Sequence, residues 1–128
     1  MTTPVYIEQT VAAALGSSPE ITALCDGRVY PLKMPQGTTL PALVYLRAEG
    51  TPEYTLQGYG SESVVIAVNS FAHTYEEAKE LALAVRPVMT APPIKAILQK
   101  DADVYDEDVA ALCVSAEYLC QQKGVHNG

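Results

Sequence analysis

The chain has 128 residues, 48% of them hydrophobic and 18% charged, which is long enough for one folded core and too apolar for wholesale disorder. Eight lysines and arginines against fifteen aspartates and glutamates give a net charge of −7. This balance argues against nucleic acid or an anionic membrane as the main partner, because both need a basic face. We expect a single domain over residues 1–128, frayed at residues 1–3 and 123–128.

The three cysteines, Cys25, Cys113 and Cys120, are widely spaced and form no CxxC pair. An odd, scattered set of this kind indicates reduced, mostly buried thiols. No apolar run approaches the ~18 residues needed to span a bilayer. The sequence after Met1 has no basic start followed by an apolar stretch, so no secretory signal is recognised. We therefore expect folding in the cytoplasm.

The N-terminal part predicts two helices. Thr3 followed by Pro4 is typical of an N-cap with proline in the first turn, and Gly16 is expected to end this helix. Its inward positions are Ile7, Val11, Ala14 and Leu15. Ser18 and Pro19 then start a short helical turn that directs Ile21 and Leu24 inward, before a turn at residues 25–27.

The middle of the chain predicts strands. A short extended piece at residues 29–32 is followed by an irregular loop at residues 34–39, and then by a strand at residues 42–49 whose apolar face is Ala42, Val44, Leu46 and Ala48. Residues 50–60, with four glycine or proline positions and two tyrosines, are interpreted as a long connecting loop. Residues 62–71 form a second strand that is apolar on both faces, as expected for a central strand.

The sequence Thr74-Tyr75-Glu76-Glu77 has the spacing of a capping box, so a helix is expected to begin here. Its apolar positions are Ala78, Leu81, Ala82, Val85 and Met89. Pro87 removes a backbone donor, and the helix is expected to end near Arg86 or to kink there. Pro92-Pro93 is expected to interrupt any regular secondary structure.

The last third is less clearly patterned. Ile94, Ala96, Leu98 and Val104 indicate a strand or an irregular extended segment, and the acidic run at residues 101–108 is interpreted as a solvated turn. Residues 109–122 are rich enough in alanine for a helix, but their strict alternation favours a strand. The order of elements predicts an α+β domain: a mainly antiparallel twisted sheet with helices packed on one face.

No set of residues points to catalysis. His73 and His126 have no close cysteine or carboxylate partner in sequence, so a zinc site is not expected. The acidic run lacks the order of an EF-hand loop, and the glycine-rich residues 58–61 lead into a strand rather than the helix that a phosphate loop needs. We predict no catalytic, cofactor-binding or metal residues, and no enzyme.

The tyrosines carry more information. The chain has eight of them and no tryptophan. Tyr54 and Tyr59, with Gln57 between them, are the candidate contact residues for a partner or a second copy, because tyrosine buries much area at little entropic cost. The alternative is that both tyrosines lie at the edge of the core with their hydroxyl groups in water.

Several segments, in this order, resemble the tail-completion (tail-terminator) proteins of long-tailed bacteriophages and prophages. They are Gly27–Leu32, Pro35–Gly37, Leu40–Tyr45, Gly50–Tyr54 and Thr74–Arg86, with residues 104–108 leading into the last strand. The likeness covers about residues 5–121. It departs from the family pattern at Pro87 and in the cysteine-bearing final strand, which affects the expected packing.

The resemblance implies a structural role. Such proteins cap the finished tail tube as a six-fold ring, end its polymerisation and provide the surface that joins the head-completion complex. The implied partners are further copies of the chain, the tail tube protein and a head-completion or connector protein, first in the host cytoplasm and then in the virion tail. Two alternatives are an interaction module of a related injection apparatus and a small enzyme whose site brings His73 to Cys25 or Cys113 at a subunit interface.

Overall fold

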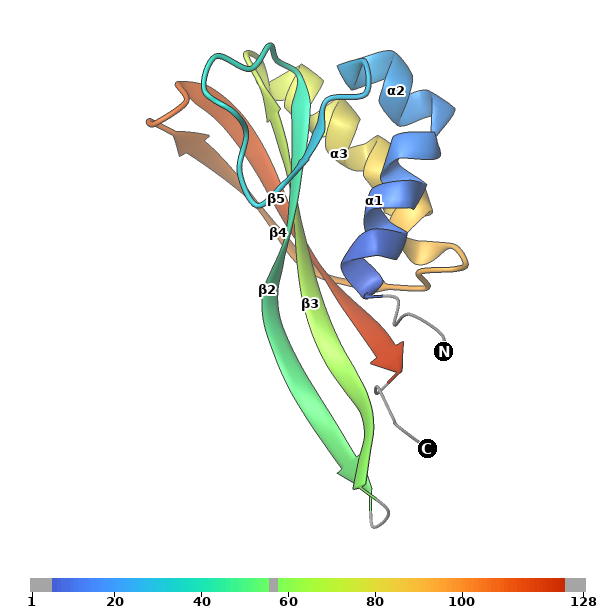
Figure 1. The fold of residues 1–128 in the computed structure, drawn as a ribbon. Helices are drawn as coiled ribbons and strands as arrows, with labels where there is room; N and C mark the ends of the chain where they lie inside the picture. The colour runs from blue at the N-terminus through green and yellow to red at the C-terminus, as the bar shows by residue number, and fades with distance from the viewer. Residues whose placement is uncertain (1–5, 56–57, 124–128) are drawn as a thin grey trace.

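The computed structural model describes residues 6–55 and 58–123. Within these residues, the helices lie on one face of a strongly twisted sheet (Figure 1), which confirms the expected α+β class. The bounds are α1 Ile7–Ser17, α2 Pro19–Cys25, β1 Val29–Pro31, β2 Ala42–Thr55, β3 Gly58–Ala72, α3 Tyr75–Thr90, β4 Ile97–Asp106 and β5 Ala111–Lys123. None of the helices in this described part is long and apolar enough to cross a membrane.

The strands form one five-stranded sheet in the order β1-β2-β3-β5-β4. The short β1 pairs with β2 in parallel, and every other neighbouring pair is antiparallel. β3 is the central strand, as its two apolar faces predict. The C-terminal segment is a strand, β5, so the alternation was a better guide than its alanine content.

The main core lies between the sheet and the helices. α1 contributes Ile7, Val11 and Leu15, and α3 contributes Leu81, Val85 and Met89. The sheet supplies alternate residues that point to this side, because side chains in a strand alternate between faces. They are Leu43, Val64, Ile66, Val68, Ala116, Tyr118 and Cys120.

A smaller apolar cluster lies on the other face of the sheet, at one end. It contains Val44, Phe71, Ala111 and Cys113, covered in part by Met34 and Leu40 from the loop that precedes β2. The helices therefore pack on the side of Leu43 and Tyr45, and not on the side of Val44 and Leu46, the residues assigned to the apolar face from sequence. Alternation alone shows that two faces exist without showing which one carries the helices.

The expected long loop at residues 50–60 is wrong. β2 continues to Thr55 and β3 begins at Gly58, so the two strands form one long hairpin. Its glycines and prolines suggested a loop, but β1 covers β2 only as far as Tyr45. Beyond that point β2 is an edge strand, where a proline such as Pro52 is tolerated because the missing N–H need not face a neighbour.

The acidic turn expected at residues 101–108 is also corrected. β4 runs to Asp106, and the turn is confined to residues 107–110. Asp101, Asp103 and Asp106 have low strand propensity, and an edge position allows such residues because their side chains stay in water. Of the extended segment expected at Ile94, Ala96, Leu98 and Val104, only Leu98 and Val104 lie in β4. Ile94 and Ala96 precede the strand and are buried in the main core.

Helix boundaries differ in detail from the sequence prediction. α1 begins at Ile7 with Tyr6 as its N-cap, and its end is one residue beyond Gly16. The N–H of Tyr6 donates to the side-chain oxygen of Gln9 at 3.0 Å. Thr3 and Pro4 lie outside the described residues, as does the predicted tail at residues 124–128, whereas Lys123 is the last residue of β5.

α3 begins as predicted but ends later. The Thr74 hydroxyl accepts from the N–H of Glu77 at 3.2 Å, which confirms the capping interaction. The five predicted apolar positions are all buried. The helix passes through Pro87 to Thr90, where the threonine hydroxyl donates to the Arg86 carbonyl at 2.9 Å. Packing against the core keeps the helix intact despite the donor that Pro87 lacks.

Candidate assembly surfaces

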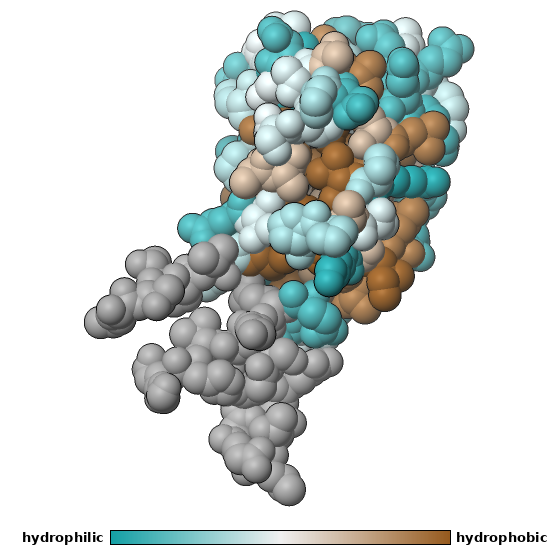
Figure 2. Space-filling view, turned by 90° about the vertical axis from the view of Figure 1, so that its right-hand side faces the viewer, coloured by the Kyte–Doolittle hydropathy of each residue, from teal (hydrophilic) through white to brown (hydrophobic). Residues whose placement is uncertain are grey.

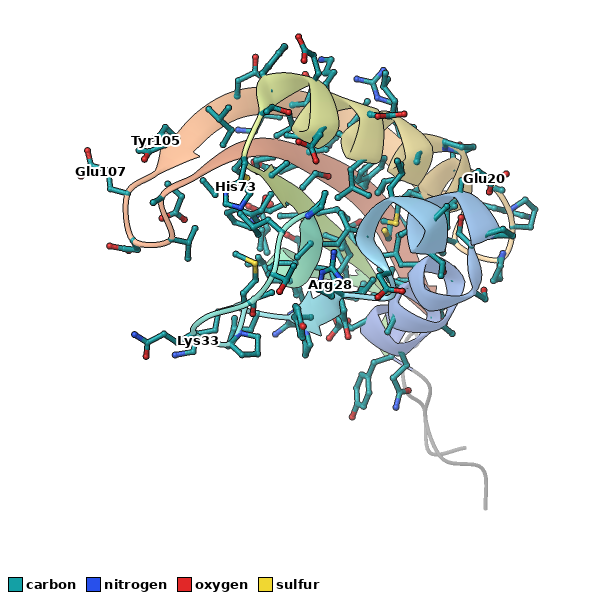
Figure 3. All side chains as sticks on the ribbon, turned by 90° about the horizontal axis from the view of Figure 1, so that it is seen from above. Glu20, Arg28, Lys33, His73, Tyr105 and Glu107 are labelled. Carbon is teal, nitrogen blue, oxygen red and sulfur yellow. The ribbon has the colours of Figure 1, made fainter. Side chains whose placement is uncertain are left out.

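The side chains that could bind a metal or act as nucleophiles are dispersed over the molecule. The described residues contain no group of three or more His, Cys, Asp or Glu side chains close enough to hold a metal ion. His73 is exposed between β3 and α3, whereas Cys25 and Cys113 are buried in α2 and β5. Figure 3 shows Glu20, Lys33 and Glu107 pointing outward at separate corners of the molecule. These labelled charges do not converge on one site.

The three cysteines are free and buried, as predicted. Burial raises the pKa of the Cys113 thiol to about 12, with a further contribution from the charge of Asp106. Burial likewise raises the pKa of Cys120 to about 11 and raises that of Cys25 above its ordinary value. A thiol is a nucleophile only as its thiolate, so these cysteines are poor nucleophiles and serve as packing groups.

The hairpin arm, residues 50–55 and 58–63, carries two of the three candidate contact residues. Tyr54 of β2 lies directly opposite Tyr59 of β3. Gln57 lies outside the described residues. Figure 1 shows the arm extending away from the helix layer, and β5 pairs with β3 only from Ser61 onward. The structure thus places the two tyrosine backbones side by side near the tip, which the sequence alone did not predict.

The β4 edge, residues 97–106, is one free side of the sheet. Its outer residues are largely exposed, including three apolar or aromatic side chains: Ile97 at 64%, Val104 at 49% and Tyr105 at 57% exposure. Sequence analysis placed Tyr105 in a turn, and it placed Val104 both in that turn and in an extended segment, so neither was recognised as part of an edge strand. One pattern could have indicated a strand here. Asp101 and Asp103 alternate with Ala102, and the β-branched Val104 and aromatic Tyr105, both common in strands, follow directly.

The β2 edge, residues 46–51, is the other free side, beyond the end of β1. On the helix side it borders a groove of about 420 Å³ lined by α1, β1 and β2, with Leu32 at its rim. Leu32 is 71% exposed. Arg47 lies on this edge, where its guanidinium contacts the Glu62 carboxylate at 3.3 Å. Gly50 leaves room for this contact, since a Cβ there would meet the Glu62 oxygen.

A third surface lies on the helix layer. A groove of about 570 Å³ runs between α1 and the C-terminal end of α3, lined by Ala13, Ala14, Val88, Ala91, Pro92 and Pro93 among others. Figure 2 faces this layer and shows apolar patches among polar residues. Small side chains and prolines leave a shallow, apolar depression here, without the convergent polar groups typical of a small-molecule site.

The family model of the tail completion protein gp17 matches residues 9–115, most of the chain, so the chain belongs to this family. Among solved structures, a chain of the virion of a native gene transfer agent particle has a TM-score of 0.70 at 16% identity, covering 89% of this chain and 92% of that one. At this identity the likeness shows the fold alone. No curated protein matches.

Family membership confirms the resemblance inferred from the ordered segments. The protein is a structural component of the phage tail that interacts with other virion proteins, and it is not an enzyme. Membership of this structural family therefore excludes the hypothesis of an enzyme site that joins His73 to a cysteine.

Proposed function

We propose that this protein caps the finished tail tube as a ring of identical copies, ends tube polymerisation and offers the joining surface for the head-completion complex. Assembly takes place in the cytoplasm of the host bacterium, and the tail tube protein and a head-completion protein are its two partners. The observation that carries the proposal is the combination of family membership with two free sheet edges on opposite sides of the sheet. A ring of identical copies needs two different surfaces on each copy.

The hairpin arm is the element we assign to contact beyond a single copy. It projects past the helices, and its tip places Tyr54 opposite Tyr59. Gln57 belongs to the same tip by sequence. Tyrosine is enriched at interface centres, because it offers a large rigid surface with a polar end.

Two experiments test the proposal. Native mass spectrometry across a range of concentrations is expected to give a discrete ring, or a monomer–ring equilibrium that shifts with concentration. Electron microscopy of particles made without the protein is expected to show tails of uncontrolled length that lack heads. A stable dimer at every concentration, or normal tail length without the protein, would overturn the proposal.

The arm is tested separately by changing Tyr54→Ser and Tyr59→Ser together. We expect the double variant to fold but to be incorporated poorly into tails. Tyr6→Ser is the matched control, because Tyr6 is 50% exposed and lies in another part of the chain. Unchanged incorporation of the double variant would remove the arm from the interface.

A further inference from the structure

The two free edges run in opposite directions. β4 is antiparallel to β5, β5 is antiparallel to β3, and β3 is antiparallel to β2. β4 therefore runs opposite to β2. When identical copies follow one another around a ring with their strands roughly along its axis, each copy keeps the same strand directions. The β4 edge of one copy then meets the β2 edge of the next in antiparallel orientation, the pairing that strands form most readily.

From this relationship we propose that neighbouring copies join edge to edge, with the β4 edge of one copy forming an intermolecular antiparallel ladder with the β2 edge of the next. The inference rests on the proposed ring and specifies its interface. Figure 3 shows β4, near Tyr105, and β1, near Arg28, on different sides of the molecule, so each copy has both surfaces available at once.

One register brings complementary residues of the two edges together at two neighbouring positions. It pairs Val104 with Leu46 on the face away from the helices, and Asp103 with Arg47 on the helix side. The sides follow from the sheet register: Asp103 pairs with Val114 and Arg47 with Ile66, both on the helix side. Val104 is 49% exposed, and the Arg47 side chain is 52% exposed, so both are accessible in a single copy.

The same register directs Tyr105 toward the groove beside the β2 edge. Tyr105 lies opposite Leu112 on β5 and therefore on the helix side of the sheet. The groove, about 420 Å³, lies on that side, between α1 and the end of β1, and its lining includes Leu32 and Tyr45. An exposed tyrosine on one copy and an apolar groove on the next are complementary in shape and polarity.

Pairing of two β4 edges with each other is disfavoured by charge. In a symmetric antiparallel pair of β4 strands, Asp101 and Asp103 of one copy would lie near Asp103 and Asp101 of the other. Like charges opposite each other destabilise a sheet. The β2 edge instead supplies Arg47, which contacts Glu62 within its own copy and still leaves half of its side chain exposed. Ring closure requires unlike surfaces, and the distribution of charge provides them.

Cysteine pairing tests the register. Val104→Cys combined with Leu46→Cys is expected to give interchain disulfides under mild oxidation, seen as a ladder up to the ring size on a non-reducing gel. Val104 lies directly opposite Cys113 on β5, so the pair is introduced into a Cys113→Ala chain, in which that intrachain disulfide cannot form. The other native thiols, Cys25 and Cys120, are buried. Ile97→Cys with Leu46→Cys is the control pair, because this register keeps these two positions apart. Dimers from Val104→Cys alone would show a symmetric β4 pairing and overturn the inference.

Charge exchange provides a second test that does not depend on disulfide geometry. Arg47→Glu is expected to weaken ring formation by about tenfold or more, because it places a carboxylate opposite Asp103 of the next copy. Glu62→Gln is included in every variant of this series, so that the lost contact between Arg47 and Glu62 does not contribute. Asp103→Arg in the same chain is expected to restore assembly. Glu20→Arg, at an exposed site on α2, serves as the control charge reversal. Circular dichroism confirms that each variant is folded.

The outcomes separate the interface from the function. If the purified wild-type protein is a monomer in solution, the crosslinking test and the charge-exchange test are both made on purified tails that contain it. Rings or capped tails without the Val104–Leu46 crosslink and without charge rescue would refute edge pairing and leave the proposed function intact. Tails that reach normal length without the protein would refute the function itself. A crosslink with rescue supports both.

Discussion

Arg86 of α3 and Asp101 of β4 form an ion pair with 2.6 Å between the Nη2 and Oδ2 atoms. The contact joins the helix layer to the edge strand. Both side chains are partly exposed, at 40% and 35%. An ion pair in such a position is screened by water and by salt, so its contribution to stability is small even though its geometry is good.

We therefore expect Arg86→Gln and Asp101→Asn to lower the free energy of unfolding modestly. The coupling energy from a double-mutant cycle is expected to be about 0.2–1 kcal/mol. Urea unfolding of the wild type, the two single variants and the double variant measures it. Repeating the cycle in high salt should reduce the coupling. A value above about 2 kcal/mol would mean that the pair is effectively buried.

Tyr118 is fully buried in the main core. Its hydroxyl has no hydrogen-bond partner in the part of the chain that the structure describes. Burial raises its pKa to about 12. A buried polar group without a partner costs free energy, so Tyr118→Phe should leave stability unchanged or raise it by about 1 kcal/mol. Thermal and urea unfolding measure this change. Tyr118→Ala, which leaves a cavity, should cost about 3–5 kcal/mol. Marked destabilisation by the phenylalanine would indicate a bound water at the hydroxyl.

The buried thiols predict a loss of stability in alkaline solution. The folded pKa of Cys113 is raised from 9.0 to about 12. The stabilising effect is complete below pH 9.0 and is lost as pH rises toward 12, because the unfolded state releases its proton first.

Between about pH 8 and pH 10, this one thiol should lower the free energy of unfolding by about 1.4 kcal/mol. Cys113→Ala removes the titrating group, so its drop over the same range should be smaller by that amount. Comparing the pH dependence, rather than the stabilities themselves, cancels the cost of the lost side chain. Identical slopes for the two proteins would contradict the prediction.

The N-cap of α3 offers a local test of stability. Because the Thr74 hydroxyl accepts from the N–H of Glu77, Thr74→Ala leaves that donor without its partner. The expected loss is about 0.5–2 kcal/mol in urea unfolding, whereas Thr74→Ser should lose much less. Thr22→Ala, on the exposed side of α2, is the control. Equal effects of the alanine and serine variants would mean that the hydroxyl does not stabilise the helix.

The elements that depend on local sequence patterns could be predicted from the sequence alone. The capping spacing at Thr74 and the apolar period from Ala78 to Met89 specified α3, because a helix buries one stripe every 3.6 residues. Alternation in β5 and on both faces of β3 specified two strands of the sheet. The ordered segments also indicated the family, which the match over residues 9–115 confirmed.

Which strands form the edges of the sheet became clear from the fold and not from the sequence. Residues 50–60 contain turn-forming glycine and proline, yet pairing between β2 and β3 holds residues 50–55 and 58–60 in strands. The aspartates of β4 are tolerated because this strand has a neighbour on one side alone. Strand order arises from contacts between residues far apart in the chain, and the propensities of single residues do not predict these contacts. The free edges, and with them the candidate assembly surfaces, follow from that order.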